Sequence, residues 1–459
     1  MGENQQENRC KPYLRGESEG AAQRTLWGSL EACTANERTE NSVDVTQNLM
    51  EEVVSRENLQ RALKRVVSNK GAPGVDGMTV AQLRVFLKEH WVALKEKLLR
   101  GQYCPSPVKR VEIPKLDGGV RKLGIPTVLD RFIQQALLQV LQKSWDPTFS
   151  NNSYGFRPRR SAHQAIHQAQ DHIRAGYSWV VDIDLEQFFD RVNHDRLMSS
   201  IAKRVKDKRV LKLIRRYLNS GVMDTGLLKP TREGTPQGGP LSPLLSNLVL
   251  DELDQELECR GHRFVRYADD CNVYVKSQAA GERVMASLTG FITKRLKLRV
   301  NSSKSAVARP WERKFLGFTF GRKHKQRKVA AKSLKRFKQR VRIMTRRTVG
   351  KNIKQVVSDL NIFIQSWMGY FKIAETITDF KVLDQWIRHR LRCLQWKQWG
   401  RRGYRELRKR GISVRNAWNV SKSAKGWWRI SRSPVLFHPM PKRFFDSLGL
   451  LTLRDLQST

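Results

Sequence analysis

Apolar residues along the chain follow two periods, which predicts a body that mixes helices with strands. Helical spacing from Asn48 to about Lys70 predicts an amphipathic helix, and the turn-rich segment Gly71–Gly77 ends it. From there to residue 320, helical patterns mix with short β-prone runs, so we expect an α+β body. The clearest helices are Asp130–Lys143, Ala162–Ala175, His194–Ser200 and Leu244–Cys259, and the clearest strands are Trp179–Ile183, Phe264–Tyr267, Asn272–Val275 and Phe315–Phe320.

The pattern changes sharply after residue 320. Residues 321–350 contain thirteen Lys or Arg and no acidic residue, yet their apolar residues keep helical spacing. This combination predicts a helix with one apolar stripe and a basic remainder, which needs anionic ligands nearby. Residues 351–400 continue as helices with Trp among Lys and Arg, and the last sixty residues are basic and aromatic. Residues 1–45 are polar and weakly periodic, which predicts a poorly ordered extension.

Charge narrows the choice of partner. The 459 residues carry a formal net charge of +43, so a polyanionic partner is expected, with nucleic acid favoured over a membrane surface. No stretch reaches the roughly 18 apolar residues that cross a bilayer, and the first ten residues lack a signal-peptide pattern. The six cysteines are scattered without a CxxC pair, which argues against a zinc site or a disulfide framework and fits a reducing, cytoplasmic compartment.

Two adjacent carboxylates are the strongest chemical signal. Asp269 and Asp270 follow Tyr267-Ala268 between two β-prone runs, which predicts a strand, a tight turn and a strand. Like charges side by side are unfavourable unless a cation neutralises them, and Mg²⁺ prefers carboxylates together with substrate phosphates. The alternative is a solvated Asp-Asp turn.

A second carboxylate cluster lies upstream. A buried strand at Trp179–Ile183 runs into Asp182 and Asp184, so one of these carboxylates is expected beside the Asp269-Asp270 turn. Three carboxylates around two Mg²⁺ ions form a phosphoryl-transfer site. A helix-capping role for the upstream aspartate is the competing interpretation.

Two further segments have features expected of a nucleotide-binding site. The run Gly234–Pro243 has an unusual density of Gly and Pro around Gln237, and it is not a Walker loop because no Gly-Lys-Ser/Thr follows. The run Ile113–Lys122 predicts a hairpin with a Gly-Gly tip, on which Lys115 and Arg121 would hold a triphosphate. Ordinary turns are the alternative for both.

The order of these segments resembles the reverse transcriptase/maturases encoded by group II introns. The resemblance extends over about residues 48–440. The chain lacks the Cys pairs and the His-rich signature of the endonuclease that some relatives carry, and in this it looks like the endonuclease-less class C group. The matching blocks are, in order, Gly71–Gly77, Lys115–Arg131, Phe149–His163, Asp182–His194, Gly234–Asn247, Arg266–Asp270, Leu298–Lys304 and Phe315–Phe320, followed by Leu360–Glu375 and Asp384–Trp399, which look like the maturase thumb.

The resemblance implies a role for each matching residue. The carboxylates that bind two Mg²⁺ ions are matched by Asp184, Asp269 and Asp270, and Asp182 is the weaker candidate for the ligand in its strand. Phe189, with Phe188 as its rival, matches the aromatic residue that excludes a ribose 2′-hydroxyl. The remaining implied dNTP contacts are Lys115, Arg121, Gln237 and Lys304, the implied primer grip is Phe315, Leu316 and Gly317, and the expected RNA contacts are Lys335, Arg336, Arg340, Arg346 and Arg347.

The expected fold is therefore a right-hand polymerase with a three-helix thumb and a basic C-terminal region. Its expected parts are an extension at 1–47, fingers and palm at 48–320, a thumb (domain X) at 321–400 and a DNA-binding region at 401–459. The expected function is an RNA-directed DNA polymerase, cytoplasmic in a bacterium and associated with nucleic acid, that binds its intron RNA, promotes splicing and copies the intron by target-primed reverse transcription.

The expected partners are group II intron RNA, an RNA template with a DNA primer, target DNA and dNTPs; no membrane partner is expected, and the oligomeric state is left open. Two alternatives remain: a splicing cofactor that has lost polymerase activity, and a host-adopted reverse transcriptase without an intron.

Overall fold

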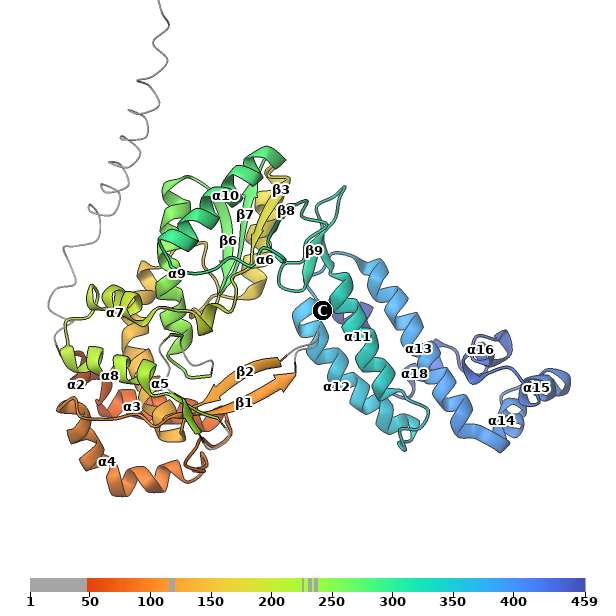
Figure 1. The fold of residues 1–459 in the computed structure, drawn as a ribbon. Helices are drawn as coiled ribbons and strands as arrows, with labels where there is room; N and C mark the ends of the chain where they lie inside the picture. Colours follow the sequence, from red (N-terminus) through yellow and green to blue (C-terminus); the bar gives the residue numbers. More distant parts are fainter. Residues whose placement is uncertain (1–47, 115–119, 225–226, 230–232, 235–237, 459) are drawn as a thin grey trace, which may run out of the picture. The chain divides into compact units, whose positions relative to one another are not determined.

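The computed structural model describes residues 48–458 apart from 115–119, 225–226, 230–232 and 235–237 (Figure 1). The chain forms two compact units. The first comprises Met1–Arg160, Ile183–Cys271 and Ala286–Lys304, and the second comprises Ser161–Asp182, Asn272–Met285 and Ser305–Thr459. The chain passes between the units five times: after Arg160, after Lys304, and within β3 (Trp179–Ile183), β7 (Asp270–Val275) and α10 (Gln278–Lys294).

Helices make up most of the first unit, and buried apolar stripes hold them together. Helix α5 (Val128–Trp145) begins after Thr127, whose side chain accepts a hydrogen bond from the backbone N–H of Asp130, a common N-cap arrangement. Asn58 on α3 (Arg56–Ser68) donates to the carbonyl of Ala136 on α5 at 2.9 Å, which joins these two helices. The helices of this unit are α2 (Leu49–Val53), α3 (Arg56–Ser68), α4 (Leu83–Leu99), α5 (Val128–Trp145), η1 (Asp146–Thr148), η2 (Phe188–Asp190), α7 (His194–Ala202), α8 (Lys208–Asn219) and α9 (Ser242–Cys259).

A four-stranded sheet of order β2-β1-β4-β5 also belongs to the first unit. Strands β1 (Val108–Pro114) and β2 (Val120–Ile125) form an antiparallel hairpin in which Pro114 is opposite Val120. The arms of the predicted hairpin are therefore confirmed, while its tip lies outside the described residues. Strand β4 (Val222–Asp224) pairs parallel with β1 and antiparallel with β5 (Leu227–Lys229).

A second four-stranded sheet has the order β6-β7-β3-β8. Its edge pair is antiparallel, with Asp182 of β3 opposite Ala306 of β8. The short antiparallel ribbon β9–β10 pairs Phe318 with Val329 and belongs to the second unit. The strands are β3 (Trp179–Ile183), β6 (Arg263–Tyr267), β7 (Asp270–Val275), β8 (Ala306–Ala308), β9 (Phe318–Phe320) and β10 (Arg327–Val329), and the accompanying helices are α6 (Ala162–Arg174) and α10 (Gln278–Lys294).

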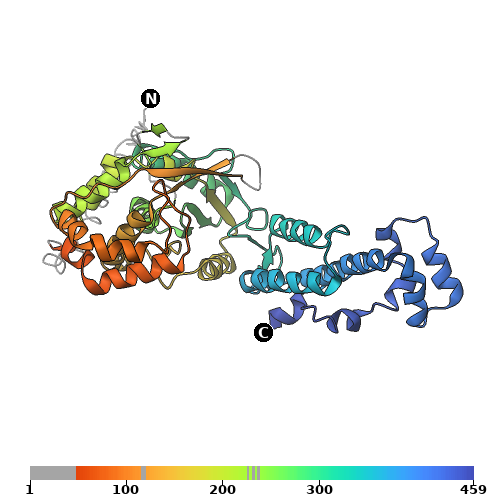
Figure 2. The same ribbon diagram turned by 90° about the horizontal axis from the view of Figure 1, so that it is seen from below.

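Three long helices follow β10 in the second unit, and Figures 1 and 2 show them side by side. They are α11 (Ala331–Met344), α12 (Ile353–Phe371) and α13 (Ile377–Trp399). Asn352 and Gln355 form a reciprocal capping box that starts α12, so its boundary is encoded locally. Shorter helices complete the chain: η3 (Gly400–Arg402), α14 (Gly403–Lys409), α15 (Val414–Ser421), α16 (Trp427–Ile430), α17 (Pro434–Phe437), α18 (Lys442–Asp446) and α19 (Leu453–Ser458).

Two predicted elements differ from the structure. The helix expected from Asn48 to Lys70 is two helices, α2 and α3, because Ser55 between them takes an extended conformation (φ −64°, ψ 145°) as the N-cap of α3. The strand expected at Phe315–Phe320 begins only at Phe318, because Leu316 and Gly317 have left-handed φ values of 49° and 87°. The other predicted helices and strands are confirmed, with ends that differ by two residues at most.

Candidate active site

The adjacent carboxylates lie at a strained turn between β6 and β7. Ala268 has a φ of 58°, in the left-handed region that non-glycine residues rarely adopt. The Ala268 side chain is buried, that of Asp269 is half-buried and that of Asp270 is exposed. The strand, tight turn and strand predicted here are therefore confirmed, and both carboxylate residues are more exposed than Ala268.

The backbone of a distant segment packs directly under this turn. Tyr154 N–H donates to the carbonyl of Arg266, and Arg266 N–H donates to the carbonyl of Asn152, both at 2.9 Å. A Cβ atom added to Gly155 would lie 2.2 Å from the backbone N of Ala268. Only glycine leaves room for this approach. The sequence motif that contains Gly155 supported the resemblance, but it gave no role to this glycine.

The upstream carboxylates have different partners. Asp184 follows β3; its carbonyl accepts from Asn301 N–H at 2.8 Å, and its Oδ1 lies 3.6 Å from Nζ of Lys304. Asp182 instead accepts two hydrogen bonds from the Arg313 guanidinium, at 2.8 and 2.6 Å. Asp182 is thus held in a two-bond ion pair within the second unit, whereas Asp184 faces an exposed lysine at a longer distance. This difference favours Asp184 as the metal ligand.

The chemistry of Asp184, Asp269 and Asp270 suits a hard cation such as Mg²⁺, which takes carboxylate oxygens. All three belong to the first unit. Among the described residues, however, no group of three or more His, Cys, Asp or Glu side chains is close enough together to hold a metal ion. The structure therefore supplies the donors and the turn, and the convergence of the three carboxylates stays a prediction.

The predicted sugar-selecting aromatic residue lies in the turn η2. Phe188 is buried in the core at 3% exposure, whereas Phe189 is half-buried, and their rings meet edge-to-face with centroids 5.3 Å apart. Of the two candidates, Phe189 is the more exposed, and its role in sugar selection stays a prediction.

The glycine-rich loop is anchored at both ends within the first unit. Gly234 has a φ of 91°, and a Cβ atom there would lie 2.8 Å from the Phe189 carbonyl oxygen. At the other end, a Cβ atom on Gly238 would lie 2.2 Å from the carbonyl oxygen of Gly124 in β2. The two anchors of the loop are thus placed near η2 and near the hairpin strand that contains Arg121. Gln237 and Lys115 lie outside the described residues, as does the side chain of Arg121.

The predicted primer grip is a tight turn held by the long helices of its own unit. Phe315 and Phe318 exchange two backbone hydrogen bonds of 2.9 Å across Leu316 and Gly317. The Tyr370 hydroxyl on α12 donates to the Leu316 carbonyl at 2.7 Å, and the Ser333 hydroxyl on α11 donates to the Gly317 carbonyl at 3.0 Å. The turn therefore depends on α11 and α12 for its shape.

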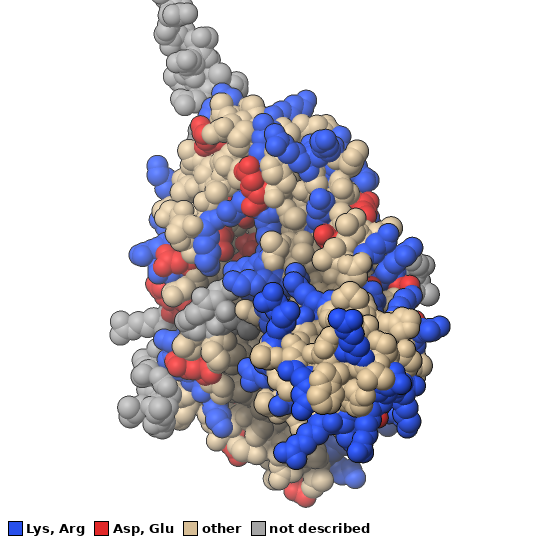
Figure 3. Space-filling model, turned by 90° about the vertical axis from the view of Figure 1, so that its right-hand side faces the viewer, with Lys and Arg blue, Asp and Glu red and all other residues tan. Residues whose placement is uncertain are grey.

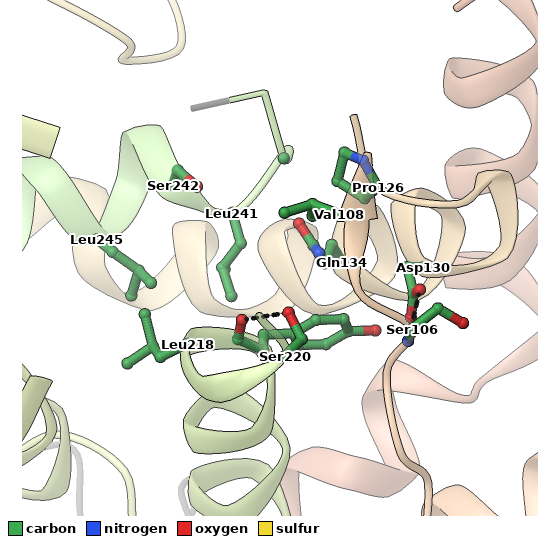
Figure 4. Close-up of a pocket in the computed structure, with 12 residues that line it drawn as sticks. Ser106, Val108, Pro126, Asp130, Gln134, Leu218, Ser220, Leu241, Ser242 and Leu245 are labelled. Carbon is green, nitrogen blue, oxygen red and sulfur yellow. Dashed lines mark hydrogen bonds between the residues drawn. The ribbon is translucent and has the colours of Figure 1, made fainter. Parts of the chain in front are cut away.

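A small cavity in the first unit borders the C-terminal part of the glycine-rich run, where Gly239, Leu241 and Ser242 line it (Figure 4). It lies beside α5 and α9. One of its polar lining residues is Asp130, whose carboxylate accepts from the Ser106 N–H at 3.1 Å and the Tyr103 hydroxyl at 2.8 Å. Burial raises the pKa of Asp130, while hydrogen bonds from Thr127 and Tyr103 oppose that rise. The space suits about one water molecule and is too small for a nucleotide.

The second unit presents a strongly basic surface. Figure 3 shows Lys and Arg spread over the face that carries the C-terminal helices, with few acidic side chains among them. On α11, Lys335 and Arg340 are exposed, and Arg346 and Arg347 are exposed in the turn that follows. Lys338 and Arg342 lie 6.0 and 5.7 Å from the ring of Trp386 on α13. No helix in the described part of the chain is long and apolar enough to cross a membrane.

Comparison with known proteins agrees with these features. The family described as "Reverse transcriptase (RNA-dependent DNA polymerase)" matches residues 113–320, and the "Group II intron, maturase-specific domain" matches residues 334–411. Members of the reverse transcriptase family typically depend on a divalent metal ion.

Individual relatives cover different shares of the chain. Protein YkfC of Escherichia coli (strain K12) is 36% identical over 301 residues, which are 57% of this chain and 79% of that protein. Group II intron-encoded protein LtrA of Lactococcus lactis subsp. cremoris is 37% identical over 195 residues, which are 42% of this chain but only 32% of that protein.

Solved structures show weaker likeness. A chain of a partial Cas6-RT-Cas1--Cas2 complex has a TM-score of 0.36 at 24% identity, covering 54% of this chain and 43% of that one. A telomerase from Candida albicans has a TM-score of 0.39 at 13% identity, covering 66% of this chain and 62% of that one. Both family domains are present in this order, and the chain covers 79% of Protein YkfC at 36% identity. The chain therefore belongs to the group II intron reverse transcriptase/maturase family.

Proposed function

We propose that this protein copies RNA into DNA at the Asp269-Asp270 turn and binds the RNA of a group II intron through its helical second unit. The observation that carries the proposal is the pair of family domains, polymerase then maturase, on one chain with an intact carboxylate turn. In this proposal fingers and palm occupy 48–320, the thumb 321–400 and a DNA-binding region 401–459.

Asp184, Asp269 and Asp270 would hold two Mg²⁺ ions. When bound, such ions activate a primer 3′-hydroxyl and neutralise charge on the phosphate that is transferred. The residues of the chain then orient the reactants. Lys304, which lies 3.6 Å from Asp184, is exposed and has the length to turn toward a triphosphate, where its ammonium would give a proton to the leaving pyrophosphate.

Selection of deoxynucleotides gives a first test. We expect Phe189→Val to raise incorporation of ribonucleotides relative to deoxynucleotides by about 10- to 100-fold, because a smaller side chain leaves space for a 2′-hydroxyl. The measurement is single-nucleotide primer extension with dNTP and rNTP in parallel. Phe188→Val is the matched comparison: because Phe188 is buried, this change should lower the melting temperature and leave sugar selection unchanged. The opposite pattern would assign the selective role to Phe188.

RNA binding by α11 gives a second test. Replacing Lys335, Arg340, Arg346 and Arg347 with Gln should weaken RNA binding, and the slope of log K against log salt should fall by about 0.7 for each phosphate that the protein no longer neutralises. The measurement is filter binding at several salt concentrations. Replacing Arg84, Lys88, Lys95 and Lys97 on α4, in the first unit, with Gln removes the same charge and should leave the slope nearly unchanged. Equal effects of the two sets would show that only net charge matters.

The intron-related role is tested with the chain's own locus. We expect transcripts of the DNA that flanks the reading frame to contain a group II intron, whose splicing at low Mg²⁺ concentration requires the protein. A locus without an intron ribozyme would favour the host-adopted alternative. Splicing that requires the protein, in a preparation that does not extend primers, would favour the splicing cofactor alternative.

A further inference from the structure

Arg266, just before the carboxylate turn, has the largest side chain that is fully buried in the described part of the chain. Its guanidinium makes two bonds to one carboxylate: Nε to Asp254 Oδ1 at 2.7 Å and Nη2 to Asp254 Oδ2 at 2.5 Å. The remaining nitrogen, Nη1, donates to the Ala268 carbonyl at 2.9 Å and to Asn247 Oδ1 at 3.1 Å. One side chain therefore joins a buried acid, a buried amide and the carbonyl of the strained turn residue.

Helix α9 provides the rigid support for this arrangement. Asn247 and Asp254 are seven residues apart on α9, which places them on one face of the helix, two turns apart. The Asn247 amide also donates to the carbonyl of Gly155 at 2.9 Å, and Gly155 is the residue that packs under Ala268. The same face of α9 thus fixes Arg266 and the segment beneath the turn.

Stability alone does not account for an ion pair at this position. Burying two charges costs free energy that apolar side chains of equal volume would avoid. Burial raises the pKa of Asp254 to about 6, although the charge of Arg266 opposes the rise. What apolar side chains cannot supply is a fixed donor to the Ala268 carbonyl, and a non-glycine residue at a φ of 58° needs such an external restraint.

We propose that Arg266 is a positioning residue for the carboxylate turn: Asp254 and Asn247 fix its guanidinium, which holds the Ala268 carbonyl and so sets the direction of the Asp269 and Asp270 side chains. This inference rests on the proposed function, in which those carboxylates bind metal. It gives α9 a part in metal binding although α9 supplies no ligand. Groups that orient metal ligands typically change metal affinity by about 10- to 100-fold when they are altered.

The first test is Arg266→Lys, which keeps the positive charge but cannot make the four hydrogen bonds of the planar guanidinium. The Mg²⁺ concentration for half-maximal primer extension should rise by about 10-fold or more. Binding of Mn²⁺, followed by electron paramagnetic resonance with an RNA template, a dideoxy-terminated primer and dNTP, should weaken to the same extent. RNA affinity should stay unchanged. A folded Arg266→Lys protein with the metal dependence of the wild type would overturn the proposal.

The second test adds Ala268→Gly to Arg266→Lys. Glycine adopts left-handed φ values without strain, so it should restore at least about 3-fold of the lost metal affinity if the arginine acts by holding the turn. A role confined to core packing predicts no such rescue. If Arg266→Lys does not fold, Asn247→Ala removes one acceptor and leaves the ion pair with Asp254 in place. It should shift the Mg²⁺ requirement in the same direction by a smaller factor, and an unchanged requirement would overturn the proposal.

The matched control is Asp251→Asn. Asp251 is buried on the same helix, three residues before Asp254, but it pairs with Arg204 at 2.8 Å. We expect this variant to keep the metal dependence of the wild type.

Failure of this inference can be distinguished from failure of the proposed function. If the wild type extends primers and the Arg266 and Asn247 variants show no change in metal dependence, only the positioning role is removed. If the wild type neither extends primers nor binds Mn²⁺, both the positioning role and the proposed function are removed.

Discussion

Replacing Asp269 and Asp270 together with alanine should lower primer extension by at least about 10³-fold, because the metal contribution to the transition state amounts to several kcal/mol. Both carboxylates lie at the tip of a turn, half-buried and exposed, so their removal creates no cavity in the core. RNA affinity should stay within about 2-fold of the wild type, since the basic surface of the second unit is untouched. The measurements are extension on an RNA template and RNA binding in the same preparation.

Two exposed glutamates on α4 provide the control for this double variant. Glu89→Ala with Glu96→Ala removes the same charge from the first unit, and extension should stay near the wild-type rate. Circular dichroism of the aspartate variant should match that of the wild type. Loss of folding in that variant, or extension at the wild-type rate, would contradict the assignment of the metal site to this turn.

Gly155→Ala should lower extension by about 100-fold or more, because a displacement of about 1 Å at a catalytic group can cost that factor. The added Cβ atom would lie 2.2 Å from the N of Ala268 and 2.9 Å from the C of Tyr267. Both are backbone atoms, so the turn itself must move. The measurement is the extension rate at saturating dNTP and Mg²⁺, together with the melting temperature.

Gly290→Ala is the matched glycine control. Gly290 lies on α10, in a segment of the first unit, and an added Cβ atom there meets nothing within 4 Å. Alanine should stabilise the helix by about 0.5–1 kcal/mol and leave extension unchanged. A Gly155→Ala protein that extends primers like Gly290→Ala would show that the turn tolerates displacement.

Local patterns in the sequence predicted much of the fold. Residues 351–400 were predicted as helices and form α12 and α13, and strand β3 was predicted with its observed ends. Two elements were wrong in detail because backbone conformation overrode hydrophobic pattern. Ser55 lies extended at the N-cap position of a second helix inside an apparently continuous one, and Leu316 and Gly317 turn where a strand was expected.

The candidate site was predicted less completely. Its carboxylates were found because adjacent aspartates between β-prone runs are unusual, and the family comparison supports the polymerase they imply. Gly155, Asn247 and Arg266 were missed as individual residues since their roles depend on contacts across many residues: Asn247 bonds a carbonyl 92 positions away. No local pattern encodes such a contact. Roles for Lys115 and Gln237 stay predictions, because these residues lie outside the described part of the chain.

The most direct test of the central claim is primer extension by the purified protein on an RNA template with a DNA primer, dNTPs and Mg²⁺. We predict full-length cDNA, abolished by chelation of the metal and restored by Mg²⁺. Tight binding of the RNA with no extension at any Mg²⁺ concentration would contradict the polymerase assignment and leave a splicing cofactor that keeps the polymerase fold for its shape.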